Sequence, residues 1–102
     1  MIGCRALIAT VGFSKEPIEF SARKFKPRII RLVCTNESLQ RAMELKQVLD
    51  KDAECKLIVI PNGAEPSNVM KQIYKTCEEL DKLGIKKHEI VVDGTGGTKP
   101  MS

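Results

Sequence analysis

Four short apolar runs alternate with three longer amphipathic stretches along this chain of 102 residues. The runs cover residues 6–11, 29–34, 55–60 and 89–92. Each is short, rich in β-branched side chains and closed by turn-forming residues, a pattern typical of strands in a parallel sheet. We therefore predict four strands that are buried on both faces.

The stretches between these runs place apolar residues at the spacing of amphipathic helices. The second predicted helix covers residues 37–50 after Asn36, a good N-cap, and the third covers residues 66–83 and stops at Gly84. The apolar positions of the three helices are, in chain order, Ile18, Ala22 and Phe25; Leu39, Ala42, Met43 and Leu49; and Val69, Ile73, Cys77 and Leu80.

This alternation predicts an α/β fold, namely a Rossmann-like three-layer parallel sheet with helices on both faces, in one domain over residues 1–102. Ligands of such sheets bind outside the carboxyl ends of the strands. The loops at these ends are residues 12–16, 35–38, 61–65 and 93–99. In the doubly wound order the first and fourth strands are neighbours, so the first and last of these loops would flank one cleft. Pro100 would open a further helix but is followed by only two residues, so we expect a chain truncated after the fourth strand or completed by a partner.

Composition and charge limit the environments and the kinds of partner that we expect for this protein. A hydrophobic content of 42% with 29% charged residues is that of a globular protein, and no apolar run approaches the roughly 20 residues that cross a membrane. The start of the chain lacks the pattern of a secretory signal, so we expect a cytoplasmic protein. The net charge of +4 favours an anionic partner, but the 4% of aromatic residues and the lack of a DNA-reading motif argue against direct DNA binding.

The four cysteines, Cys4, Cys34, Cys55 and Cys77, are far apart in the sequence and form no Cys-x-x-Cys pair. His88 is the one histidine that could join them as a metal ligand. We therefore expect buried free thiols, no metal site and no cofactor.

A glycine-rich segment follows the last predicted strand. Its glycines allow close approach of the backbone, its amide groups can face an anion, and lysine and threonine add donors suited to a phosphate or a ribose. It departs from the Walker loop and from Gly-x-Gly-x-x-Gly, and a plain turn would need fewer donors. The segment is Asp93, Gly94, Thr95, Gly96, Gly97, Thr98 and Lys99.

Residues 91–102 resemble the Asp-x-Thr-Gly-Gly-Thr-Lys-x-Met motif of the CRISPR-associated Rossmann fold, or CARF, domain. Residues 10–17 resemble the first-strand loop of that family, and the order of predicted strands and helices fits the family over essentially the whole chain. The late motif is the specific part of the resemblance. The usual helix and strands after the motif, and any effector domain, are not in this sequence.

The resemblance implies a domain that senses cyclic oligoadenylate, the second messenger of type III CRISPR systems in antiviral defence. In that family two domains pair as a homodimer, the ring lies across the dimer, and binding regulates an attached effector. The ligand-binding residues carried over by motif are Thr95, Gly96, Gly97, Thr98 and Lys99, with Gly12, Phe13 and Ser14 as the opposite wall. Asn36 and Asn62 join them because their loops open on the same edge of the sheet.

Three alternatives remain open. The domain could be a ring nuclease, a metal-independent enzyme in which Ser14 and Lys99 neutralise charge while a ribose 2′-hydroxyl attacks the adjacent phosphate. It could also be the ligand-sensing domain of a transcriptional regulator, or a fragment of an ordinary mononucleotide-binding enzyme. The ring size and the effector are beyond the sequence.

Overall fold

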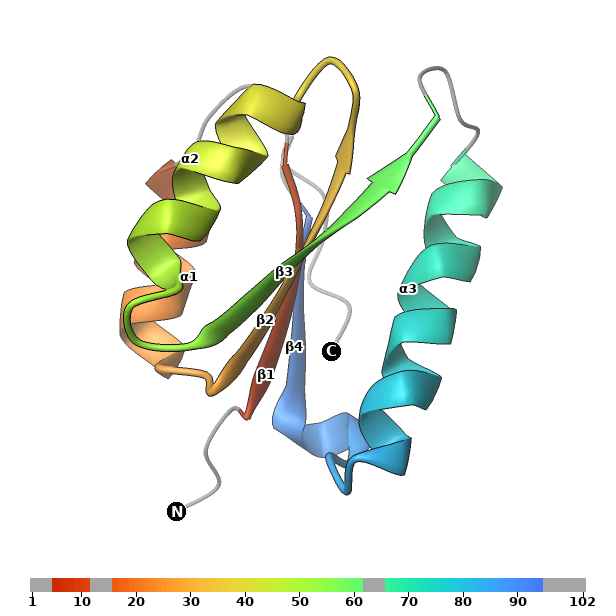
Figure 1. Ribbon diagram of the computed structural model, residues 1–102. Coiled ribbons are helices and arrows are strands. Elements are labelled where there is room, and N and C mark those ends of the chain that lie inside the picture. Colours follow the sequence, from red (N-terminus) through yellow and green to blue (C-terminus); the bar gives the residue numbers. More distant parts are fainter. Residues whose placement is uncertain (1–4, 12–15, 62–65, 95–102) are drawn as a thin grey trace.

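A computed structural model of the protein describes residues 5–11, 16–61 and 66–94 (Figure 1). Its strands are β1 (Ala6–Thr10), β2 (Ile29–Thr35), β3 (Glu54–Ile60) and β4 (Ile90–Gly94). Its helices are α1 (Glu16–Phe25), α2 (Leu39–Leu49), α3 (Pro66–Lys82) and a short 3-10 helix, η1 (Lys87–Glu89). None of the helices in these ranges is long and apolar enough to span a bilayer.

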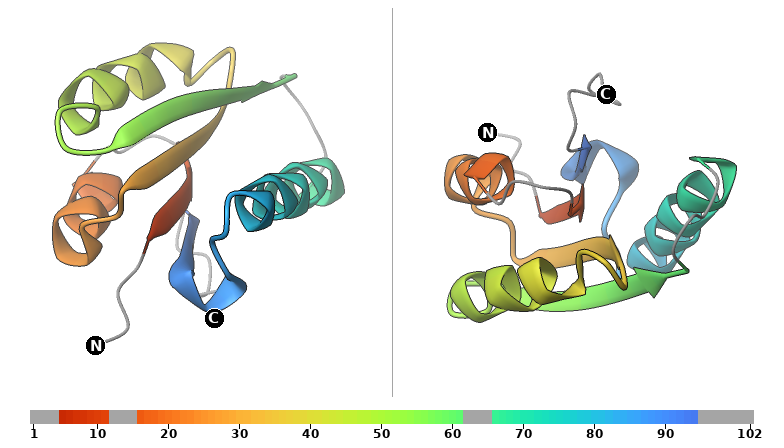
Figure 2. Two further views of the ribbon diagram at one scale, coloured as in Figure 1. Left: turned by 60° about the horizontal axis from the view of Figure 1, so that its bottom comes forward. Right: turned by 90° about the horizontal axis from the view of Figure 1, so that it is seen from above.

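The four strands form one all-parallel sheet in the order β3-β2-β1-β4. Helices α1 and α2 pack on one face of the sheet and α3 packs on the other (Figures 1 and 2). The chain proceeds from β1 outwards to β3 and then returns across the sheet to β4, so right-handed crossovers place the third helix opposite the first two. The predicted Rossmann-like three-layer fold is confirmed.

Each face of the sheet carries its own apolar core. Residues of β1 and β2 point alternately to the two faces, and every residue of these strands is buried except Thr10, Ile29 and Thr35. The cluster beneath α1 and α2 comprises Leu7, Ala9, Val11, Ile18, Ala22, Ile30, Leu32, Cys34, Ala42, Leu45, Leu49 and Cys55. The cluster beneath α3 comprises Ala6, Ile8, Val33, Ile60, Ile73, Leu80 and Ile85.

The prediction that every strand is buried on both faces is wrong for β3, and in β4 the side chains of Ile90, Val91 and Val92 are only half-buried. Glu54, Lys56 and Val59 of β3 are exposed, because β3 is an edge strand and the helices leave part of its surface open to water. The fourth strand also differs from its predicted bounds. Glu89 belongs to η1, and the strand extends through Asp93 to Gly94.

Helix α2 begins later than predicted. Asn36 and Glu37 lie in a turn and Ser38 is the N-cap, so Asn36 does not cap the helix. Met43 is exposed and Leu45 is fully buried, which rotates the buried stripe away from the predicted one. The positions in contact with the sheet are thus set by how α2 lies across β2 and β3.

Helix α3 matches the prediction to within one residue. Ile73 and Leu80 of its predicted stripe are buried, and it stops at Gly84, which has a φ of 88°. The N–H of Ile85 donates to the carbonyl oxygen of Leu80 at 3.0 Å, and that of Gly84 donates to Asp81 at 2.9 Å. These two bonds form a Schellman motif, in which glycine supplies the left-handed backbone that the stop requires.

Candidate functional site

The candidate site lies at the edge of the sheet where the four parallel strands end. Strands β1 and β4 are direct neighbours there, with Ala9 opposite Asp93 and Thr10 opposite Gly94. The chain therefore leaves β1 at Val11 and β4 after Gly94 from adjacent positions. This confirms the predicted adjacency of the first and fourth strands, which is the switch point of a doubly wound sheet.

The first two residues of the glycine-rich segment belong to the sheet and not to a loop. Asp93 and Gly94 continue the pairing of β4 with β1, so only the part from Thr95 onwards follows the strand. The part of the segment that is predicted to bind an anion is therefore the shorter run of residues 95–99, and it follows a strand end whose backbone is fixed by pairing with β1.

Among the predicted ligand-binding residues, Asn36 is the one that the structure describes. It is exposed, in the turn that follows β2. The other predicted positions lie outside the described residues, so how they are arranged around a ligand stays a prediction. These positions are Gly12, Phe13, Ser14, Asn62, Thr95, Gly96, Gly97, Thr98 and Lys99.

The turn that carries Asn36 is held by hydrogen bonds between Thr35 and Ser38. The N–H of Ser38 donates to the carbonyl oxygen of Thr35 at 3.1 Å, and the N–H of Thr35 donates to the hydroxyl oxygen of Ser38 at 3.0 Å. Ser38 is only 7% exposed, so its hydroxyl is committed to this turn and makes no cap bond to α2. Thr35 and Ser38 thus fix the backbone from which Asn36 projects, a positioning role that the sequence prediction missed.

The strand order ranks the two asparagines. Asn36 follows β2, which is next to β1, whereas Asn62 comes shortly after β3, at the opposite side of the sheet from β4. With strands about 4.8 Å apart, the end of β3 lies about 14 Å from the end of β4. The strand order therefore supports Asn36 more than Asn62 as a member of one site with the residues after β4.

The described thiols are packed within the fold. Cys34 and Cys55 are buried, as predicted, whereas Cys77 is half-buried and Cys4 lies outside the described residues. Burial raises the pKa of the Cys55 thiol to about 11 and raises the pKa of Cys34 as well. These thiols are therefore protonated and unreactive at neutral pH.

The one histidine of the chain lies away from the candidate site. His88 is exposed in η1, before the amino end of β4, and thus at the opposite edge of the sheet. Within residues 5–11, 16–61 and 66–94, no cluster of three or more His, Cys, Asp or Glu side chains could hold a metal ion.

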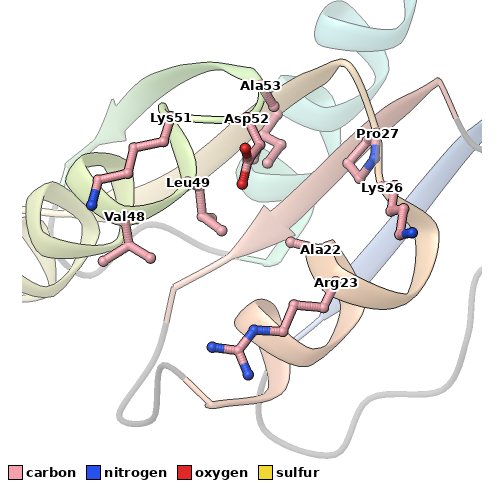
Figure 3. A pocket seen from close by; sticks show the side chains of 10 residues that line it. Ala22, Arg23, Lys26, Pro27, Val48, Leu49, Lys51, Asp52 and Ala53 are labelled. Atoms are coloured by element: carbon pink, nitrogen blue, oxygen red, sulfur yellow. The ribbon is translucent and has the colours of Figure 1, made fainter.

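A groove of about 660 Å³ also lies at that opposite edge, between the last turns of α1 and α2 (Figure 3). It is bounded by Pro27 and Ala53, which precede β2 and β3, and so it is separate from the carboxyl ends of the strands. Among the described residues, this groove and the switch point are therefore two different places on the molecule.

No protein-family model and no curated protein matches the chain. The fold and the switch point define its class by themselves: it is a Rossmann-like α/β domain whose first and fourth strands end side by side.

Proposed function

We propose that the protein is a cytoplasmic sensing domain for cyclic oligoadenylate, and that it binds the ring at the switch point between β1 and β4. The observation that carries the proposal is the pairing of Thr10 with Gly94, because it starts the two candidate ligand segments from neighbouring strand ends. One segment contains Gly12 and Ser14, and the other runs from Thr95 to Lys99.

The chemistry of these segments suits a ring of riboses and phosphates. Backbone amides of glycine-rich turns bind phosphate oxygens, threonine hydroxyls pair with phosphates or riboses, and a lysine amine neutralises charge. The net charge of +4 adds long-range attraction for a polyanion. The resemblance of residues 91–102 to the CARF motif selects the cyclic oligoadenylate from the wider class of nucleotides.

A homodimer completes the proposal. A ring with rotational symmetry can present the same groups to two identical protomers, so each protomer needs to bind only half of it. In this arrangement the bound ring stabilises one mutual orientation of the two domains, and that orientation regulates an effector domain carried elsewhere.

Calorimetry with cyclic tri-, tetra- and hexa-adenylate tests the proposal directly, with AMP and NAD as reference ligands. We expect one of the rings to bind with a stoichiometry of one ring per two chains, and its affinity to fall as salt is raised. Binding of AMP or NAD without binding of any ring would contradict the proposal and favour a mononucleotide enzyme. Chromatography of the ring after incubation distinguishes a sensor from a ring nuclease, whose product would carry a 2′,3′-cyclic phosphate and a free 5′-hydroxyl.

A matched pair of lysine variants tests the site. Lys99→Ala removes a candidate phosphate contact, and a hydrogen bond to a charged group contributes about 1.5–3 kcal/mol, so we expect affinity to fall about 10- to 100-fold. Lys86→Ala removes the same charge at the other edge of the sheet, where the lysine amine lies 3.8 Å from the exposed carboxylate of Asp81. We expect that variant to lose less than about 2-fold. Equal losses would mean that overall charge, and not this site, binds the ring.

A further inference from the structure

The groove between the carboxyl-terminal ends of α1 and α2, called here the α1–α2 groove, has no role in the function proposed above. Its volume of about 660 Å³ is within the range of sites that bind small ligands or short peptide segments. Figure 3 shows its side chains, which come from both helices and from the segments that lead into β2 and β3. They are Ala22, Arg23, Lys26, Pro27, Ile30, Val48, Leu49, Lys51, Asp52 and Ala53.

The floor of the α1–α2 groove is apolar. Ile30, Ala22 and Leu49 are at most 8% exposed and belong to the core beneath the two helices. Val48, by contrast, lines the groove while remaining 50% exposed. An occupant with one apolar side chain could cover Val48 and bury its exposed apolar surface beside these core residues.

The rim of the groove is positively charged. Arg23, Lys26 and Lys51 line it against a single carboxylate, that of Asp52. The positive charge continues along the chain, because four of the six residues from 23 to 28 are Arg or Lys and none is acidic. Arg23 has an ion pair with Glu19 at 3.8 Å, but its side chain is 81% exposed, so this contact is weak and can be exchanged.

Two features favour a peptide over a nucleic acid as the occupant. Figure 3 shows the Asp52 carboxylate directed into the space between the helices, where it could accept an N–H from a peptide backbone, a donor that the sugar-phosphate backbone of a nucleic acid lacks. The nearby Phe25 ring is half-buried and has the Lys24 amine 5.6 Å from its centre, so it does not offer a free face to a base.

We propose that the α1–α2 groove binds an acidic polypeptide segment of a partner protein, with one apolar side chain against Val48 and carboxylates against Lys26 and Lys51. Charge complementarity selects the acidic residues, and the apolar floor selects the side chain between them. The groove is at the edge of the sheet opposite the switch point. A partner bound there leaves the proposed cyclic-oligoadenylate site open, so the two interactions can be tested independently.

The test uses ¹⁵N-labelled protein and a capped peptide with leucine between two runs of three glutamates. We expect the amide signals that shift on titration to concentrate at Ala22, Lys26, Leu49 and Lys51. A peptide with glutamines in place of the glutamates, and one with serine in place of the leucine, should each bind at least about 10-fold more weakly. Shifts elsewhere on the surface, or equal binding of the three peptides, would overturn the proposal.

Variants of exposed residues distinguish binding at the α1–α2 groove from attraction by the overall charge of the protein. We expect Lys51→Glu to weaken peptide binding at least about 10-fold, and Lys75→Glu, the same change on the outer surface of α3, to weaken it less than about 2-fold. Val48→Ser should also weaken binding while leaving the unfolding curve nearly unchanged, since this side chain is half exposed. A single-stranded oligothymidylate of equal charge that bound more tightly than the peptide would identify the surface as a nucleic-acid site and refute the proposal.

Discussion

The end of α3 allows a quantitative test of whether its stop requires glycine at position 84. Gly84 has a φ of 88°, and a Cβ built at this position has no neighbouring atom within 4 Å. Alanine at position 84 would therefore meet no steric clash with the rest of the protein. Its whole penalty comes from placing an L-residue in the left-handed region.

That penalty can be worked out from two opposing terms. An L-residue in the left-handed region costs about 1–2 kcal/mol relative to glycine in the folded state. Alanine also restricts the unfolded chain, which returns about 0.4–1 kcal/mol. We therefore expect Gly84→Ala to lower the free energy of unfolding by about 1 kcal/mol. Gly84→Asn should lose less, because asparagine tolerates this conformation better than alanine does.

Helix α1 supplies the reciprocal variant. Lys26, which follows its last residue, has a φ of 49°, and its N–H donates to the carbonyl oxygen of Ala22 at 2.9 Å. Here the natural residue bears the strain, so Lys26→Gly should leave stability unchanged or raise it by up to about 1 kcal/mol. Lys75→Gly, in the middle of α3, should instead lose about 1 kcal/mol.

Urea unfolding followed by circular dichroism measures all four variants, with the slope of the transition expected to stay constant. The reasoning would be refuted if Gly84→Ala were as stable as the natural protein, or if alanine and asparagine at position 84 cost the same. It would also fail if Lys26→Gly and Lys75→Gly were equally destabilising.

Three further predictions concern the interior and the charges beside it. The Arg31 guanidinium is buried and lies 3.6 Å from the half-exposed carboxylate of Glu54, so Glu54→Gln should cost about 1 kcal/mol in urea unfolding, whereas Arg31→Met should be nearly neutral. A hydrogen bond from the N–H of Cys55 lowers the pKa of Asp50 below its usual 3.8, and the Lys46 amine lowers it further. The ionised carboxylate therefore stabilises the fold above pH 3.8, and this contribution is lost as the pH falls through the lowered pKa. Asp50→Asn should therefore flatten the loss of stability below pH 4 in urea titrations, and a steeper loss would contradict the assignment. The Cys55 thiol, with its pKa near 11, should react with a disulfide reagent at pH 8 only as fast as the protein opens, and urea should release it; immediate reaction in the native state would disprove its burial.

Much of the fold was predictable because its signals are local. The largely apolar runs of β1 and β2 are typical of strands in the middle of a parallel sheet, and the helical periodicity of α3 ends at a glycine that the backbone requires. The alternation of strands and helices then restricts the chain to right-handed crossovers. The adjacency of β1 and β4, and with it the edge that carries the candidate site, was predicted from the doubly wound strand order of this fold class, and the strand order of the structure confirms it.

The sequence by itself determined the fold class and the third helix with its stop, and the usual strand order of that class predicted the pair of strands between which a ligand is proposed to bind. Only the tertiary structure decided that β3 is partly exposed, that Leu45 and not Met43 faces the core, and that Ser38 closes a turn with Thr35. It also brought the ends of α1 and α2 together around the α1–α2 groove. The physical reason is that periodicity records which residues avoid water, whereas the choice of which surface remains open depends on neighbours that are distant in the sequence.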